Sequence, residues 1–222
     1  LRSGAGRVSI ATHPSHAALL VATRPELMSH PIADGADLDP LLEGADVIAF
    51  GPGLGQSDWA RDVYARVAAA KQPSVWDADA LNLLADAPAV ANRRVLTPHP
   101  GEAARLLGTD TGTIQDDRPA ALAALTAKYG GTAVLKGAGS LISTDSVPYV
   151  CVSGNPGMAA PGMGDVLTGI IAALIGQGVD APLAAAIGVE AHARAGDRAA
   201  ACGERGLLAT DLMLELRAIL NP

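Results

Sequence analysis

The sequence predicts an α/β fold in which a mostly parallel central sheet carries helices on both faces. Short runs of β-branched residues alternate with longer runs rich in alanine and leucine, which is typical of strand–helix–strand units. The length of 222 residues and a hydrophobic content of 49% suit one domain with a complete core. Because only 3% of the residues are aromatic, this core must be aliphatic.

Each expected strand is a short apolar run bounded by turn residues. The last three lie close together, separated by Gly137-Ala138-Gly139 and Thr144-Asp145-Ser146, so we expect them to form an antiparallel edge on the parallel sheet. The expected strands span residues 7–11, 18–22, 46–50, 74–77, 94–96, 132–136, 141–143 and 148–152.

The expected helices follow from apolar stripes at helical spacing. One stripe comprises Trp59, Val63, Val67 and Ala70, and Leu212, Leu216 and Ile219 form another near the end of the chain. Gly108 follows the last residue of an expected helix, where glycine is favoured, and Pro182 lies in the first turn of another, where proline is favoured. The expected helices span residues 58–70, 101–107, 117–129, 165–175, 182–201 and 209–220.

Charge and cysteine content exclude several classes of protein. The net charge is −7 without a basic block, which argues against a nucleic-acid partner. No apolar run approaches the roughly 20 residues that span a bilayer, and no signal peptide is recognisable, so we expect no membrane association. Cys151 and Cys202 suit buried free thiols in a reducing cytoplasm, and no zinc-ligand spacing is present.

The most informative segment runs from Asn155 to Asp165, Asn-Pro-Gly-Met-Ala-Ala-Pro-Gly-Met-Gly-Asp, directly before an expected helix. Gly162 and Gly164 let the backbone turn so that amide groups converge, and the helix N-terminus adds a partial positive charge. The result is a cradle for an anion. Asp165 beside this cradle is either a helix cap or a group that handles a proton, and we favour the proton-handling role.

Two further glycine-rich segments follow expected strands. Gly51-Pro52-Gly53-Leu54-Gly55 fits neither a dinucleotide fingerprint nor a P-loop, and it is either a ligand-binding loop or a tight turn. In Lys136-Gly137-Ala138-Gly139-Ser140, the lysine and the serine hydroxyl are candidates for phosphate contacts. Taken alone, this second segment better suits a hairpin turn with a surface lysine.

Two polar segments also follow strands. Thr97-Pro98-His99-Pro100-Gly101-Glu102 holds His99 between two prolines at a strand end. In Asp77-Ala78-Asp79-Ala80-Leu81-Asn82, the two carboxylates either bind Mg²⁺ through water or cap the next helix, and we favour a structural or supporting role. Because these four loops all follow strands of a parallel sheet, they meet at one edge, which predicts a phosphate-handling pocket for a nucleotide and a second substrate.

Together these residues resemble the ADP/ATP-dependent NAD(P)H-hydrate dehydratases of the ribokinase-like superfamily. The family pattern N-x-G-M-A-x-x-G-x-G-D is met in full by residues 155–165, and the other four segments occur in the family's order and spacing. The resemblance covers essentially the whole chain. It implies a three-layer αβα fold in which the central sheet is mostly parallel.

The resemblance implies repair of hydrated nicotinamide cofactors. A phosphoryl group from ADP would be transferred to the hydroxyl of (6S)-NADHX or (6S)-NADPHX, and elimination would then give NADH or NADPH, AMP and phosphate. Phosphate, with a second pKa of about 6, is a far better leaving group than hydroxide, whose conjugate acid has a pKa of about 15.7. The resemblance also implies Mg²⁺, a cytoplasmic location and a homo-oligomer, often a tetramer.

Roles carried over from the family can be given to individual residues. Asp165 would take the hydroxyl proton, while the amides between Gly162 and Gly164 would hold the transferring phosphoryl group. Gly55 and His99, with Asp165, would contact the hydrate, and Asn155, Asp77 and Gly53 are candidates for a supporting shell. Contacts with the nucleotide would come from Lys136, Gly137, Ala138, Gly139, Ser140 and Gly164.

The chain departs from the family at its start. The family has a strand, a glycine-rich loop and a helix before the segment that matches residues 1–6, so residues 1–222 are expected to form one dehydratase domain lacking these elements. Either the full polypeptide contains further residues before position 1, or the chain is a truncation with one strand fewer and an open hydrate pocket. Two other functions remain open. One is a ribokinase-like small-molecule kinase such as a hydroxyethylthiazole kinase, and the other is a non-catalytic nucleotide-binding protein.

Overall fold

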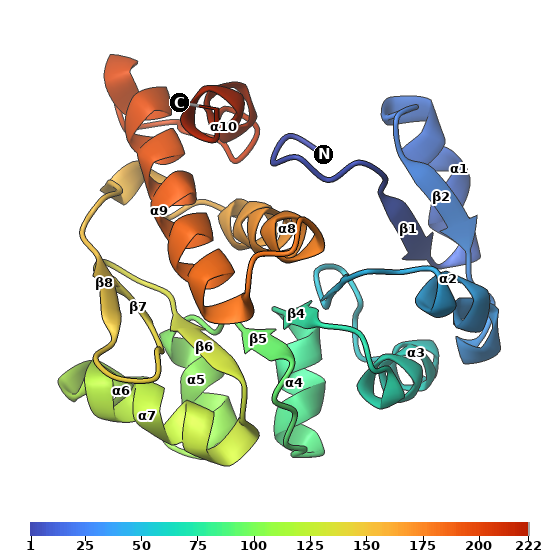
Figure 1. Cartoon of the computed structure of the whole chain (residues 1–222), viewed down its shortest axis with the longest axis horizontal. Helices are drawn as coiled ribbons and strands as arrows, with labels where there is room; N and C mark the ends of the chain where they lie inside the picture. The colour runs from blue at the N-terminus through green and yellow to red at the C-terminus, as the bar shows by residue number, and fades with distance from the viewer. Residues whose placement is uncertain (222) are drawn as a thin grey trace.

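A computed structural model describes residues 1–221 and contains a six-stranded sheet in the order β3-β4-β5-β6-β7-β8 (Figure 1). The first four strands are parallel neighbours, whereas β7 and β8 continue the sheet in antiparallel pairing. The expected antiparallel edge is therefore confirmed. The strands are β3 (Ile48–Phe50), β4 (Ser74–Trp76), β5 (Arg94–Leu96), β6 (Thr132–Leu135), β7 (Ser140–Ile142) and β8 (Tyr149–Cys151).

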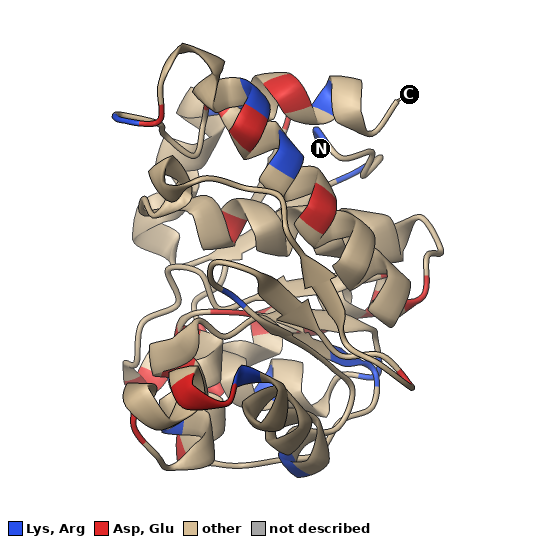
Figure 2. Ribbon diagram, turned by 90° about the vertical axis from the view of Figure 1, so that its left-hand side faces the viewer, with Lys and Arg blue, Asp and Glu red and all other residues tan. Residues whose placement is uncertain are grey.

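Helices cover both faces of this sheet, which gives the predicted three layers (Figures 1 and 2). Neighbouring residues of a strand point to opposite faces. Trp76 and Leu96 accordingly enter one apolar core, while Val75 and Val95 enter the other. One face carries α3 (Asp58–Ala69), α4 (Asp79–Asp86), α5 (Pro100–Leu107) and α7 (Arg118–Tyr129), with α6 (Thr111–Asp116) beside α5, and the other carries α8 (Met163–Gly176), α9 (Ala181–Ala199) and α10 (Leu212–Ile219).

The surface helices carry charged residues of both signs. Lysine and arginine alternate with aspartate and glutamate over the helices that Figure 2 displays. Among residues 1–221, no helix combines the length and the apolar character needed to cross a membrane.

A separate two-stranded parallel sheet lies near the start of the chain, formed by β1 (Ser9–Thr12) and β2 (Met28–Pro31) and joined by α1 (Pro14–Thr23). The strand predicted at residues 18–22 is wrong because this segment lies inside α1. Pro14 occupies the first turn of α1, where its fixed φ favours a helix. The strand β2 was not predicted, nor were the short helical segments at Gly35–Leu38 and Asp39–Glu43.

The two cysteines differ in environment. Cys151 is buried, and burial, reinforced by its hydrogen bond to Glu190, raises the pKa of its thiol to about 11. Cys202 is exposed, so the expectation that both thiols are buried is wrong for this residue. It lies in a short 3₁₀ turn that continues α9 (Ala200–Cys202).

His192 on α9 is expected to make stability fall in mild acid. Burial, followed by the charge of Lys136, lowers the pKa of this imidazole to about 4, from an ordinary value of 6.5. Below pH 6.5 the unfolded chain binds a proton at this position that the folded chain does not, so unfolding becomes easier until about pH 4. The expected loss is about 2 kcal/mol by pH 5 and approaches about 3 kcal/mol near pH 4. Urea unfolding at pH 7.5 and pH 5 measures it, and His192→Gln should flatten the difference; an equally steep dependence in that variant would contradict the assignment.

Candidate functional site

The polar and glycine-rich segments meet at the carboxyl edge of the parallel strands. Loops beginning at Gly51, Asp77, Thr97 and Lys136 directly follow β3, β4, β5 and β6. The start of α8 reaches the same place, since a β-carbon placed on Gly164 would lie 3.1 Å from both Asp77 Oδ2 and Lys136 Nζ. The structure thus brings the predicted segments together around the first turn of α8.

The first turn of α8 has the geometry of an anion cradle. Gly162 caps the helix in the left-handed conformation, with a φ of 84°, a conformation that side chains other than glycine rarely adopt. In the described chain, the amides of Gly164 and Asp165 have no carbonyl or side-chain acceptor. The alternative that Asp165 is the N-cap is wrong, because it lies inside the first turn, three residues after Gly162.

The carboxylate of Asp165 is exposed at this turn yet electrostatically perturbed. Partial desolvation raises its pKa above the ordinary value, and the nearby negative charge of Asp77 acts in the same direction. The positive charge of Lys136 opposes both. A carboxylate whose pKa is raised holds a captured proton more readily, which suits a general base.

Beneath Asp165 lies a buried network of charged side chains. Lys136 Nζ is 2.7 Å from Asp77 Oδ1 and 3.7 Å from Glu102 Oε2, and Asp77 is only 1% exposed. Thr168 Oγ1 on α8 donates to Asp77 Oδ2 over 3.1 Å. The interpretation of Lys136 as a surface lysine is therefore wrong: its ammonium group lies between two buried carboxylates.

His99 caps α5 and presents its ring to solvent. Its Nδ1 accepts from the amides of Gly101 (3.0 Å) and Glu102 (3.3 Å), while Glu102 Oε2 accepts from the His99 amide (2.8 Å). Since Nδ1 accepts, the proton of the neutral ring is on Nε2, 3.6 Å from Glu102 Oε1. The exposed Nε2–H is a donor at the mouth of the site.

The loop after β3 needs glycine for two reasons. A β-carbon on Gly51 would lie 1.8 Å from the carbonyl oxygen of Asp77, so only glycine fits there. Gly53 and Gly55 have positive φ values and open space around them. The Gly55 amide donates to Asp79 Oδ2 over 2.9 Å, which holds this loop against the start of α4.

Both carboxylates of the Asp77–Asn82 segment have partners within the protein. Asp77 is paired with Lys136, and Asp79 accepts from Gly55 and, over 3.3 Å, from the side chain of Asn82. In residues 1–221 there is no cluster of three or more His, Cys, Asp or Glu side chains able to hold a metal ion. The carboxylates therefore serve as structural partners in this arrangement.

Residues 136–140 form the hairpin between β6 and β7, as the simpler interpretation predicted. Ser140 Oγ donates to the carbonyl of Gly137 over 3.0 Å. Arg118, at the start of α7, donates through Nη2 to the carbonyls of Leu135 (3.1 Å) and Gly139 (3.2 Å). Arg118 thus fixes the position of the hairpin. Sequence reasoning missed this role because Arg118 belongs to no motif and lies far from the hairpin in the sequence.

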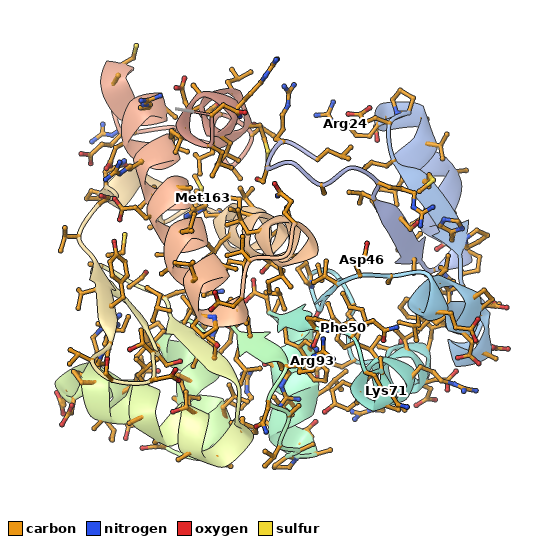
Figure 3. The ribbon with its side chains drawn as sticks, in the orientation of Figure 1. Arg24, Asp46, Phe50, Lys71, Arg93 and Met163 are labelled. Carbon is orange, nitrogen blue, oxygen red and sulfur yellow. The ribbon has the colours of Figure 1, made fainter. Side chains whose placement is uncertain are left out.

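Asn155 fixes the segment before α8 to α9. Its side chain accepts from the Gly157 amide (3.1 Å) and donates to Asp197 Oδ1 (3.0 Å), and the Gly154 amide donates to Asp197 Oδ2 (2.9 Å). Met158 packs against Gly196 of α9, where a β-carbon would overlap the methionine side chain. Met163, at the start of α8, lies close to α9 in Figure 3. These contacts position the cradle.

A small cavity of about 180 Å³ adjoins the loop after β3. It is lined by Gly53 and Leu54 from that loop and by His13 and His16 at the start of α1. Sequence reasoning missed both histidines because it placed a strand where α1 lies. The cavity is completed by Thr12, Ser57 and Trp59.

Comparison with known proteins places this arrangement in a family. The sequence model described as NAD(P)H-hydrate dehydratase matches residues 1–217. The bifunctional NAD(P)H-hydrate repair enzyme Nnr of Coxiella burnetii is 52% identical over 223 residues, covering 100% of this chain and 46% of that protein. The chain therefore spans about half the length of this curated relative.

Solved structures agree with the sequence comparison. The ADP/ATP-dependent NAD(P)H-hydrate dehydratase of Bacillus subtilis, co-crystallised with ATP/Mg²⁺ and soaked with CoA, aligns with a TM-score of 0.82 at 28% identity, covering 98% of this chain and 82% of that one. A hydroxyethylthiazole kinase from Pyrococcus horikoshii aligns with a TM-score of 0.67 at 16% identity, over 96% of this chain and 85% of that one, which shows a shared ribokinase-like fold alone. With its family-specific segments gathered around the start of α8, this chain belongs to the NAD(P)H-hydrate dehydratase family.

Proposed function

We propose that the chain catalyses the ADP-dependent dehydration of (6S)-hydrated NADH or NADPH to NADH or NADPH, with release of AMP and phosphate. Family membership and the activities for which the relatives are named support this reaction. The observation that carries the proposal is the placement of Asp165 at the first turn of α8, beside amides that have no protein acceptor.

The proposed first step is phosphoryl transfer. Asp165 takes the proton of the hydrate hydroxyl, the hydroxyl oxygen bonds to the β-phosphorus of ADP, and the bond from that phosphorus to the bridging oxygen breaks to release AMP. The amides at the start of α8 hold the negative charge that builds on the phosphoryl group. The raised pKa of Asp165 makes the carboxylate a better proton acceptor.

The proposed second step is elimination. The ring nitrogen lends its electron pair to the nicotinamide ring, the carbon–oxygen bond breaks and phosphate departs. A proton is lost from the adjacent ring carbon, which restores the double bond of NADH or NADPH. Every atom of the hydroxyl oxygen and the β-phosphoryl group is then accounted for in the released phosphate.

In this proposal the nucleotide contacts the β6–β7 hairpin and Gly164, and the hydrate contacts Gly55, His99 and Asp165. The Gly137 amide donates to Ser140 Oγ over 3.3 Å, whereas the amides of Ala138 and Gly139 are suited to phosphate or ribose oxygens. His99 offers its exposed Nε2–H to the hydrate. Lys136 then acts on the nucleotide through its charge at the floor of the site, where it remains paired with Asp77.

Arg118→Ala is expected to raise KM for ADP about tenfold with little change in kcat. The variant removes the guanidinium group that holds the hairpin through its carbonyls, so the nucleotide must order the loop on binding. Gln115→Ala is a matched control, since Gln115 accepts from Arg118 Nη1 over 2.9 Å and, among the described residues, has no hydrogen bond to the hairpin. Steady-state kinetics with varied ADP measures the effect, and equal KM values for the two variants would contradict it.

Mg²⁺ belongs to this proposal as a companion of the nucleotide. The described residues form no dedicated metal cage, and both candidate carboxylates already have protein partners. Mg²⁺ commonly binds through phosphate oxygens and water rather than through an all-protein cage.

The decisive test is absorbance at 340 nm after mixing the chain with hydrated NADH, Mg²⁺ and ADP. We expect a rise that requires ADP and yields one AMP and one phosphate for each NADH formed. A stable phosphorylated product would instead identify a small-molecule kinase, and ADP binding without turnover would identify a non-catalytic nucleotide-binding protein. Separate reactions with ATP and with hydrated NADPH would establish both preferences.

We also propose a cytoplasmic homo-oligomer, often a tetramer in this family. The absence of a basic block supports small-molecule partners over nucleic acid. Multi-angle light scattering of the purified chain measures its mass directly, with 22.3 kDa expected for a monomer.

A further inference from the structure

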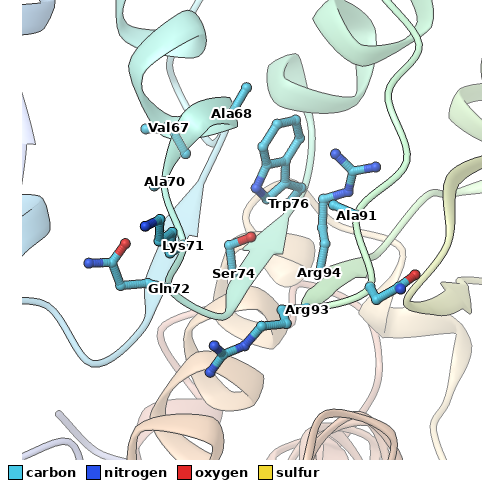
Figure 4. A pocket seen from close by; sticks show the side chains of 11 residues that line it. Val67, Ala68, Ala70, Lys71, Gln72, Ser74, Trp76, Ala91, Arg93 and Arg94 are labelled. Carbon is cyan, nitrogen blue, oxygen red and sulfur yellow. The ribbon is translucent and has the colours of Figure 1, made fainter.

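A cavity unrelated to the candidate site lies at the opposite edge of the sheet (Figure 4). Ser74 and Arg94 contribute to it from the first positions of β4 and β5, whereas the candidate site follows the last positions of these strands. Its volume of about 390 Å³ falls within the range typical of small-molecule sites. The lining residues are Val67, Ala68, Ala70, Lys71, Gln72, Ser74, Trp76, Ala91, Asn92, Arg93 and Arg94.

The lining is positively charged in an acidic protein. Lys71, Arg93 and Arg94 contribute three cations, and no aspartate or glutamate lines the cavity. The whole chain, by contrast, has 16 lysines and arginines against 23 acidic residues. Figure 3 shows Lys71 and Arg93 well apart from Met163, which marks the start of α8. The positive charge is therefore local to this cavity and separate from the anion cradle.

Two buried donors in the lining have no acceptor within the described protein. They are Trp76 Nε1 and Arg94 Nε, in residues that are only 2% and 3% exposed. Figure 4 shows the indole nitrogen on the side of Trp76 that faces Ala70 and Lys71. Buried polar groups in folded proteins nearly always have a partner, so this pair is unusual.

Arg94 is held rigidly enough to serve as part of a site. Its Nη2 donates to the carbonyls of Ala89 (2.6 Å) and Tyr129 (3.2 Å). Its guanidinium carbon lies 4.6 Å from the centroid of the Trp76 ring system. These contacts fix the guanidinium group beside the indole while leaving Nε without an acceptor.

The remaining walls are apolar, formed by Val67, Ala68, Ala70 and Ala91 together with the indole. We propose that this cavity binds a small organic anion, a carboxylate or a phosphate monoester that carries a short apolar or aromatic group. Its oxygens accept from Trp76 and Arg94, its charge is balanced by Lys71 and Arg93, and its apolar group packs against the alanine and valine walls.

The two indole N–H signals in a ¹H–¹⁵N spectrum of the full chain provide the test. The chain has two tryptophans, and Trp59 already donates to the Ile32 carbonyl over 2.9 Å, so its signal is an internal control. Trp59→Phe assigns the signals. Phenyl phosphate and phenylacetate are the organic probes, inorganic phosphate tests the ion alone, and benzyl alcohol tests the apolar group alone.

We expect the Trp76 signal to shift saturably with at least one organic anion, at about millimolar concentration or below, and the Trp59 signal to stay in place. The organic anion that binds more tightly identifies the source of the oxyanion. Benzyl alcohol and inorganic phosphate should each bind at least about tenfold more weakly. The proposal is overturned if neither organic anion gives a saturable shift, or if either control probe binds equally well.

Variants of the exposed cations locate the binding. Lys71→Gln and Arg93→Gln should each weaken the organic anion several-fold, because each removes one charge at the mouth of the cavity without disturbing the core. Arg61→Gln, on the exposed face of α3 and outside the lining, is the matched control. An equal loss in Arg61→Gln, or no loss in either cavity variant, would overturn the proposal.

Discussion

Asp165→Asn is expected to lower turnover by about 10²–10⁴-fold, the usual range for loss of a positioned general base. The amide has nearly the shape of the carboxylate but cannot take the hydroxyl proton. ADP binding should persist, because the unpaired amides of α8 remain and one negative charge next to the phosphates is removed. Single-turnover assays at 340 nm measure the chemical step, and calorimetry measures ADP affinity.

Asp58→Asn is the matched control for this prediction. Asp58 also lies in the first turn of a helix, α3, and is exposed, but it is not part of the site. Its substitution should leave turnover unchanged. Full turnover in Asp165→Asn would remove Asp165 from the reaction, whereas loss of ADP affinity together with turnover would make it a binding residue instead.

Gly51→Ala is expected to destabilise the fold by roughly 3–5 kcal/mol through overpacking combined with backbone strain. A β-carbon at this position would lie 1.8 Å from the Asp77 carbonyl and 2.7 Å from the Ala80 β-carbon, and the φ of 119° is itself unfavourable for alanine. The residues that would have to move precede and begin α4 within the core. Urea unfolding measures the loss, and a variant that does not fold would agree with it.

Gly53→Ala, two residues away, separates steric overlap from conformational strain. Gly53 also has a positive φ, 68°, but a β-carbon there would meet nothing within 4 Å. Its expected cost is about 1 kcal/mol, from the left-handed backbone alone. Equal destabilisation in the two variants would show that overlap with Asp77 is not what requires glycine at position 51.

The main sheet and most of its covering helices were predictable because their patterns are regular and their cores are continuous; α4 and α6 were not among the expected helices. In α3, Val63 and Val67 of the predicted stripe are buried, as are Leu212 and Leu216 in α10. The buried strands β4, β5 and β6 are short apolar runs between clear turn residues. For these elements, the spacing of apolar residues and the positions of turn residues were enough to predict a helix or a strand.

The start of the chain was not predictable by the same reasoning. The run Ala-Leu-Leu-Val-Ala at positions 18–22 contains no polar residue, so its pattern does not distinguish a helix from a strand. No residue of α1 is buried, so the helix has no apolar stripe facing a core. The strand β2 reads Met-Ser-His-Pro and lacks a β-branched pattern. It exists through backbone pairing with β1, an interaction between distant residues that no local pattern reveals.

For the site, the sequence located the segments but not their partners. The convergence of loops on one edge followed from parallel strand order alone. The pairing of Lys136 with Asp77, 59 positions away, and the reach of Arg118 to the hairpin depend on the packing of separate layers. Such contacts become visible only when side chains are placed in three dimensions.

The contrast between the two cysteines makes the chain suited to single-site labelling. With the Cys151 thiol buried and its pKa raised to about 11, a maleimide at neutral pH would react with Cys202 alone. The loop that follows Cys202 borders the site: the Glu204 carbonyl would meet a β-carbon on Gly157, and Ala209 would meet one on Gly162. A fluorophore on Cys202 would therefore report, without mutagenesis, on rearrangements of the segment that leads into the anion cradle.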